Sequence, residues 1–188
     1  FWAFAQSILF DNFHEEPSLA TMRVQMFTNL AYGAQGLQYF TYWQPVSPAE
    51  DFRGGPITLE GKRTAVYDYI KTLNQEIRNL SGVFYGSKVK LLQYTGKKIP
   101  LGTMRLTTLP EPLKLVDTGG KSALVSVLEN GNQRFIVIVN MDYKEKMSLT
   151  LLGDDSLKRV LKDGSIVPAS VYANTIEVEA GDMVVYTY

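Results

Sequence analysis

The chain has 188 residues, of which 45% are hydrophobic, and its 19 basic and 19 acidic side chains give a formal net charge of zero. A balanced charge argues against general nucleic-acid binding, which needs a basic field to hold phosphates. No apolar run approaches the ~20 residues that cross a bilayer. The chain has no cysteine, which excludes disulfides and thiolate metal ligands. We therefore expect a globular protein with no nucleic-acid or membrane partner, no cofactor and no metal, suited to the cytoplasm or the bacterial envelope.

The first region alternates strand and helix. Residues 1–10, FWAFAQSILF, form a nearly continuous apolar run, which is typical of a strand buried on both faces. Ser18 is a suitable N-cap, and apolar residues then recur at helical spacing up to Gly33, which predicts an amphipathic helix. A second strand is predicted over residues 36–43 and a second helix over residues 65–80. The apolar face of this second helix is marked by Val66, Ile70, Leu73, Ile77 and Leu80. The order of elements predicts two parallel, neighbouring strands.

The sequence changes character from residue 83 onward. Short strand-like runs follow one another with turn signals between them, and SALVSVLENGNQRFIVIVN is a hairpin that turns at Asn130 and Gly131. Many short strands at this spacing indicate an antiparallel sandwich or barrel. The sequence thus predicts an α/β plus all-β chain with two domains, residues 1–80 and residues 81–188.

Two strand–helix units are too few for a parallel sheet, which needs more strands and helices on both faces. The first strand also begins abruptly at Phe1 and Trp2. We expect residues 1–80 to be the C-terminal part of a larger α/β domain. The alternative is a small α/β protein that has been trimmed by processing.

Four segments carry a resemblance to a known family: FWAFAQS, MRVQMFTNLAYGAQGLQYFTYWQP, YDYIKTLNQEIRNL and the ending EAGDMVVYTY. Together they resemble the C-terminal third of β-galactosidase-like glycoside hydrolases of the family 42 type. This resemblance implies a partial TIM barrel, with residues 1–7 and 37–43 as its last two strands and residues 19–32 and 65–80 as its last two helices. It further implies that residues 83–188 form a terminal antiparallel β-sandwich. The partners would be a carbohydrate substrate and the remainder of the barrel, and a periplasmic or extracellular location stays open.

Barrel active sites lie at the C-terminal ends of the strands, and this places four residues as candidates for substrate binding. Trp43 ends the second strand, where its indole face could stack on a sugar ring, and Tyr42 precedes it. Packing of the barrel is the alternative for Tyr42, as it is for Tyr39 and Phe40. Gln6 ends the first strand, where an amide could bind a sugar hydroxyl. His14, the single histidine of the chain, lies in the loop that follows.

Glycoside hydrolysis usually needs two carboxylic groups, and the resemblance implies a nucleophilic Glu at the end of the first strand. Gln6 stands there instead, so no catalytic residue is assigned in this chain. Three explanations stay open. Glu15 or Glu16 in the following loop takes the role, the second acid lies elsewhere in the barrel, or the parent protein only binds glycans. The loop after Trp43 carries Glu50, Asp51 and Arg53, a further set of rim candidates.

Two functions from different classes therefore compete. The first is the C-terminal portion of a glycoside hydrolase that acts on β-linked sugars, with this chain alone inactive. The second is a non-catalytic glycan-binding or structural module of a carbohydrate-active protein. For residues 83–188 a scaffold role is the simplest interpretation, because no aromatic binding face stands out in their sequence.

Overall fold

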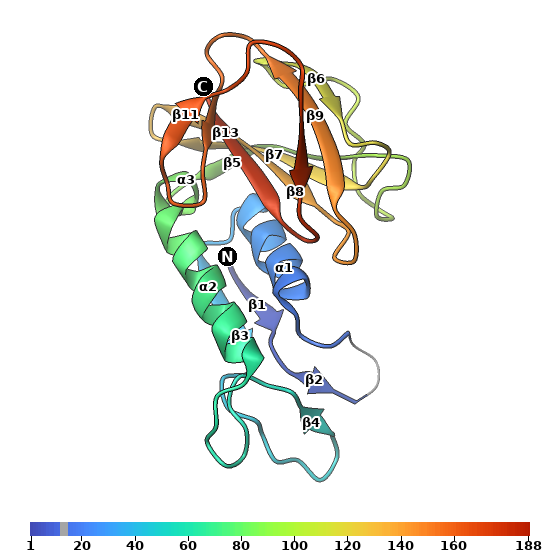
Figure 1. Cartoon of the computed structure of the whole chain (residues 1–188), viewed down its shortest axis with the longest axis vertical. Helices are drawn as coiled ribbons and strands as arrows, with labels where there is room; N and C mark the ends of the chain where they lie inside the picture. The colour runs from blue at the N-terminus through green and yellow to red at the C-terminus, as the bar shows by residue number, and fades with distance from the viewer. Residues whose placement is uncertain (12–14) are drawn as a thin grey trace.

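A computed structural model describes residues 1–11 and 15–188 of the chain. It begins with a parallel strand pair and continues into antiparallel sheets, so the predicted fold class is confirmed (Figure 1). Strand β1 (Trp2–Gln6) pairs in parallel with β3 (Gly36–Phe40), and helix α1 (Leu19–Ala31) connects them. No helix within the described residues is long and apolar enough to span a membrane.

The first predicted strand is shorter than expected. It ends at Gln6, and the fully buried Ser7 that follows closes the pairing by donating its N–H to Phe40 O (2.8 Å) and its Oγ–H to Thr41 O (2.8 Å). The chain then turns into a separate short strand, β2 (Leu9–Phe10), which pairs antiparallel with β4 (Phe52–Arg53). The apolar run of residues 1–10 is therefore two strands with different partners.

The helices begin and end where their capping residues stand. Ser18 caps α1 in a capping box with Thr21, as predicted from the sequence, and Gly33 follows the helix at a φ of 89°. Thr64 caps α2 (Ala65–Asn79), and its side chain accepts the N–H of Val66. A short helix, α3 (Ser81–Phe84), leads to the second region.

The second region is a two-layer antiparallel sandwich. Its larger sheet has the order β11-β10-β13-β8-β7-β5, and its smaller sheet has the order β12-β9-β6. The strands are β5 (Lys88–Thr95), β6 (Leu113–Asp117), β7 (Ala123–Asn130), β8 (Gln133–Asn140), β9 (Met147–Gly153), β10 (Lys158–Val160), β11 (Ile166–Pro168), β12 (Asn174–Val178) and β13 (Met183–Thr187). The predicted hairpin β7–β8 is present, and its turn lies one residue later than expected, at residues 131–132 between the paired Asn130 and Gln133.

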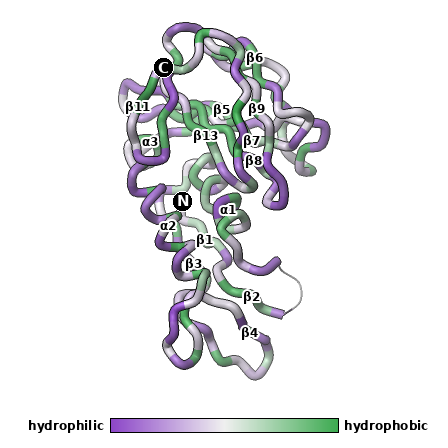
Figure 2. Tube along the Cα trace, viewed as in Figure 1, coloured by the Kyte–Doolittle hydropathy of each residue, from purple (hydrophilic) through white to green (hydrophobic). Residues whose placement is uncertain are grey.

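Helix α1 lies between the parallel strand pair and the larger sheet of the sandwich, and α2 packs beside α1 (Figure 1). One apolar cluster joins Ala5 of β1 and Phe27 of α1 to Leu73 of α2 and to Leu128 of β7. A second cluster fills the space between the two sheets of the sandwich. The larger sheet is therefore covered on both faces, which explains the runs of consecutive buried and mostly hydrophobic residues along β7, β8 and β13 (Figure 2).

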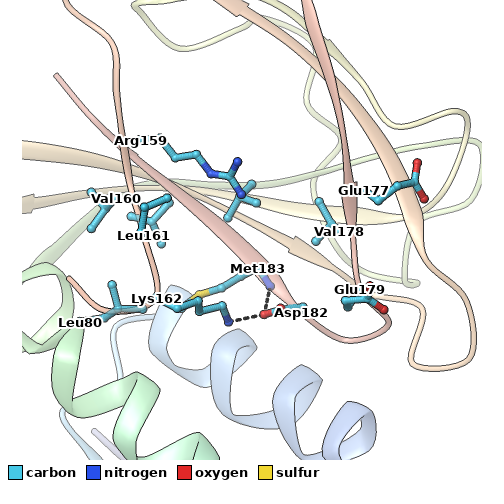
Figure 3. A pocket seen from close by; sticks show the side chains of 12 residues that line it. Leu80, Arg159, Val160, Leu161, Lys162, Glu177, Val178, Glu179, Asp182 and Met183 are labelled. Atoms are coloured by element: carbon cyan, nitrogen blue, oxygen red, sulfur yellow. Dashed lines mark hydrogen bonds and ion pairs between the residues drawn. The ribbon is translucent and has the colours of Figure 1, made fainter. Parts of the chain in front are cut away.

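Four charged side chains connect the helices to the sandwich beside this core. Arg23 of α1 pairs with Glu76 of α2, and its Nη1 lies 3.6 Å from Asp182 Oδ2. Lys162 pairs with Asp182 and with Glu76 (3.2 Å), and its Nζ lies 4.2 Å from the ring centroid of Phe27. Lys162 and Asp182 face one another at the lower edge of a cavity of about 160 Å³ (Figure 3). Two positive and two negative charges thus neutralise one another where solvent is largely excluded.

Truncation of Leu73 to Ala should cost about 2–5 kcal/mol in the free energy of unfolding, because this fully buried side chain packs within the shared apolar cluster. Urea denaturation measures the loss. The matched control is Thr72→Ala, the adjacent exposed position of α2, which should change stability by less than about 0.5 kcal/mol. Equal losses for the two variants would contradict the burial of this helix face.

Replacement of Glu76 by Gln should cost about 3–5 kcal/mol, because Arg23 and Lys162 then share a single carboxylate partner in a mostly buried site. Thermal and urea unfolding of the variant measure this loss. The control Glu50→Gln removes an exposed carboxylate and should be near neutral. A near-neutral Glu76→Gln would show that the four charges do not act as a unit.

Candidate functional site

The C-terminal ends of β1 and β3 lie next to one another because the two strands are parallel. Gln6 is opposite Phe40 in the register, as Trp2 is opposite Gly36. Side chains alternate along a strand, so Trp2 and Phe4 share one face with Gln6, and this face is exposed at Trp2 and Phe4. Ala5 lies on the other face, which packs against the helices.

Three phenylalanine rings gather at these strand ends. Phe10 of β2, Phe40 of β3 and Phe52 of β4 lie with ring centroids 6.0 to 6.1 Å apart. The sequence interpretation missed Phe10 and Phe52, since it placed one inside a single long strand and the other in a loop described only by its charges. The three rings form an apolar cluster that joins the end of β3 to β2 and β4.

Gln6 is held by helix α1 and by its own strand. Its backbone N–H donates to Gln25 Oε1 (2.8 Å), and its side-chain Nε2 donates to Ile8 O (2.9 Å). Gln25 in turn donates to Thr21 O (2.9 Å). The side-chain amide suits this position, because an ionised carboxylate could not donate to the carbonyl of Ile8.

Trp43 is fixed through its backbone while its ring is about half exposed, at 51% of its full accessible surface. Its backbone forms a bridge with Ile57, and its carbonyl accepts the hydroxyl of Thr41 (2.6 Å). The indole lies over Gly61, where a Cβ atom would be 3.5 Å from the ring. The backbone of Trp43 is therefore held in place, and its side chain still offers surface to a ligand.

Tyr42 points toward a different place. It is mostly exposed and lines a cavity of about 500 Å³ between β3 and α2, together with Tyr39, Tyr67 and Asn74. Burial raises the pKa of Tyr39, whose hydroxyl donates to Asn74 Oδ1 (2.8 Å). Neither Gln6 nor Trp43 lines this cavity. The structure thus brings Gln6 close to Phe40 but directs Tyr42 toward the helix.

Three of the acidic residues near the strand ends, Asp11, Asp51 and Glu15, are engaged by neighbours. Asp51 donates its N–H to Asp11 Oδ1 (3.3 Å) and pairs with Arg53 (2.6 Å). Glu15 accepts hydrogen bonds from Lys144 and Tyr143 of the sandwich, and these bonds hold its pKa below the usual value. His14 lies outside the described residues.

Within residues 1–11 and 15–188, no group of three His, Cys, Asp or Glu side chains is arranged to hold a metal ion. The described part of the site therefore consists of aromatic rings, one amide and engaged carboxylates.

No family model matches the chain, and no curated protein matches it. Among solved structures, the gamma-CGTase from alkalophilic Bacillus clarkii is 12% identical with a TM-score of 0.45 and is matched over 26% of its own length. The maltogenic alpha-amylase AmyB from Thermotoga neapolitana is 13% identical with a TM-score of 0.42, matched over 41% of its length. Both matches cover the whole of this chain, which thus spans about a quarter and two fifths of the two enzymes. The chain resembles a part of each, and neither is named a β-galactosidase.

Replacement of Gln6 by Glu should destabilise the chain by about 1–3 kcal/mol at pH 7, because the donor to Ile8 O is lost and a carboxylate faces a carbonyl oxygen. The folded state should raise the pKa of this Glu, so the loss should grow as the pH rises through that value and shrink at about pH 4. Urea unfolding of variant and wild type at both pH values gives the difference. A Gln6→Glu variant as stable as wild type at pH 7 would contradict the assigned amide geometry.

Proposed function

We propose that this chain is the C-terminal portion of a glycoside hydrolase of the β-galactosidase-like, family 42 type, which acts on β-linked sugars. The chain contributes part of the wall of the substrate pocket. The observation that carries the proposal is the group of aromatic rings at the C-terminal ends of two parallel strands joined by a helix. Ligands of parallel α/β folds bind at that end of the strands.

Trp43 is the first candidate for sugar contact. A sugar ring presents C–H groups on its faces, and an aromatic ring that is half exposed and fixed at its backbone suits them without a large loss of side-chain entropy. Gln6 and His14 are proposed to bind sugar hydroxyls, and Tyr42 to line the outer part of the site. These four residues form the proposed substrate-binding set.

The remainder of the barrel is the proposed partner. Strands β1 and β3 form a two-stranded parallel sheet, whereas parallel sheets are normally larger and covered on both faces. Trp2 and Phe4 leave one face of this pair apolar and exposed, at 72% and 66%. Further strands would cover that face. In this arrangement residues 1–80 belong to the barrel and residues 81–188 form a separate domain.

Catalytic carboxylates are proposed to lie in the rest of the barrel, because the end of β1 carries Gln6. The same observation favours a second candidate, a non-catalytic glycan-binding module of a carbohydrate-active protein. The two candidates share the sugar-binding surface and differ in whether a bond is broken.

The test uses the longer polypeptide that carries the complete barrel, assayed with aryl-β-galactosides and by isothermal titration with the corresponding free sugar. For the hydrolase, Trp43→Ala should lower kcat/KM by a factor equivalent to about 1–3 kcal/mol, since one large apolar contact is lost. The control Tyr172→Ala removes an exposed ring of the sandwich and should leave kcat/KM unchanged.

The outcomes separate the candidates. Sugar binding that weakens in Trp43→Ala, without hydrolysis in the wild type, would assign the glycan-binding module. An equal kcat/KM for Trp43→Ala and Tyr172→Ala would show that Trp43 does not contact the substrate.

A further inference from the structure

The loop between β8 and β9, residues 141–146, is built as a rigid unit, which we call the bracket loop. Asn140 precedes it and is fully buried. The Asn140 side chain donates to Glu145 O (2.9 Å) and to Glu179 O (3.1 Å), and it accepts the N–H of Asp142 (3.0 Å). One buried amide therefore connects both ends of the bracket loop to the turn after β12.

Asp142 fixes the bracket loop from within. Its Oδ1 accepts the backbone N–H groups of Lys144 (2.9 Å) and Glu145 (3.0 Å), and its Oδ2 pairs with Lys121 (2.9 Å). The hydrogen bond from Lys121 is the main reason that the pKa of Asp142 is lowered. The carbonyl of Asp142 accepts the N–H of Gly181 (2.9 Å). Contacts within the sandwich thus fix most of the bracket loop, and Met141 at its start also accepts the hydroxyl of Thr28 of α1 (3.7 Å).

Two side chains of the bracket loop reach the first region and converge on one atom. The Tyr143 hydroxyl and Lys144 Nζ each lie 3.0 Å from Oε1 of Glu15. Lys144 Nζ also lies 5.3 Å from the ring centroid of Tyr143, so the two donors support one another. Glu15 stands in the loop between β2 and α1, next to Glu16, which lines a cavity beside Leu9 of β2 and Arg53 of β4.

A second contact fixes the same segment a few residues later. Gly181, at a φ of 67°, approaches the first turn of α1 so closely that a Cβ atom there would be 2.2 Å from Ala20 O. Only glycine fits this backbone conformation and this approach. The sandwich therefore holds the segment at Glu15 and at Ala20.

Between these two points lie residues that shape a cavity. Glu16 and Pro17 line a cavity of about 300 Å³ together with Arg53 and Thr64. Because Glu15 is the neighbour of Glu16, its attachment to the bracket loop restricts where Glu16 and Pro17 can lie.

We infer that the bracket loop is a positioning element of the candidate site: Tyr143 and Lys144 hold Glu15 and so set the shape of the cavity lined by Glu16 and Pro17. The link to a sugar site rests on the proposed function, whereas the positioning itself does not. This gives the sandwich a role beyond covering the helices. Exposed ion pairs stabilise a fold only slightly, so the effect should be local order and not overall stability.

The experiment is hydrogen exchange of the backbone amides at Ser18 and Thr21, which end the held segment and are hydrogen-bonded to Thr21 Oγ1 (2.8 Å) and Ser18 Oγ (3.1 Å), read by NMR together with the melting temperature. The double variant Tyr143→Phe/Lys144→Met should exchange about 2- to 5-fold faster at these amides, with the melting temperature unchanged. The matched control is Lys146→Met in the same loop. Lys146 pairs with Glu179 (2.7 Å) at similar exposure, 58% against 65% for Lys144, and should leave both amides unchanged.

Charge-reversal variants distinguish the loss of this specific ion pair from a general loss of order in the loop. Glu15→Lys or Lys144→Glu alone should speed exchange, because like charges then face one another. The combination of the two should return exchange toward the wild-type rate. Unchanged exchange in the double variant, an equal effect of Lys146→Met, or failure of the reversed pair to restore protection would each overturn the inference. None of these readouts depends on glycosidase activity, so they stand apart from the test of the proposed function.

Discussion

The structure depends on the burial of one helix layer between two sheets. Phe27 and Leu73 are fully buried there, in the same cluster as Leu128 of the sandwich. Helix α1 contacts β1 on one side and β7 and β8 on the other. Neither the parallel strand pair nor the outer face of the larger sheet would be covered without these helices. The position of the candidate site relative to the sandwich is thus fixed by apolar packing in the middle of the chain.

The charges beside this layer make the arrangement specific. Apolar packing tolerates small shifts of one surface over another, whereas Arg23, Glu76, Lys162 and Asp182 must meet in one geometry to neutralise one another. Removing one partner leaves a charge that water reaches poorly, which is why the penalty is large although the pairs themselves add little. The same turn that carries Asp182 carries Gly181, so charge matching and close approach act at one place.

The helices, strands and turns could be predicted from the sequence, because each depends on a local pattern of residues. Ser18 and Gly33 mark the ends of α1, and Asn130 marks the β7–β8 turn. The break at Ser7 could not be predicted, because the residues on its two sides pair with two different strands, β3 and β4, far along the chain. The partners of Glu15 lie about 130 positions away and have no local signal at all. The Phe10, Phe40 and Phe52 cluster was missed for the same reason.

The chemistry available at the C-terminal end of β1 depends on the side-chain amide of Gln6. Its amide donates to Ile8 O and is oriented beside α1, so it is a structural part of the strand end and not a vacant acid position. The end of β1 therefore presents a fixed amide in place of a carboxylate, and the nearby carboxylates of Asp51 and Glu15 pair with Arg53 and Lys144. Beside it lie the Phe10, Phe40 and Phe52 rings and the face that Trp2 and Phe4 leave exposed. The strand ends are thus mainly aromatic and apolar, because their polar groups are already used in holding the loops together.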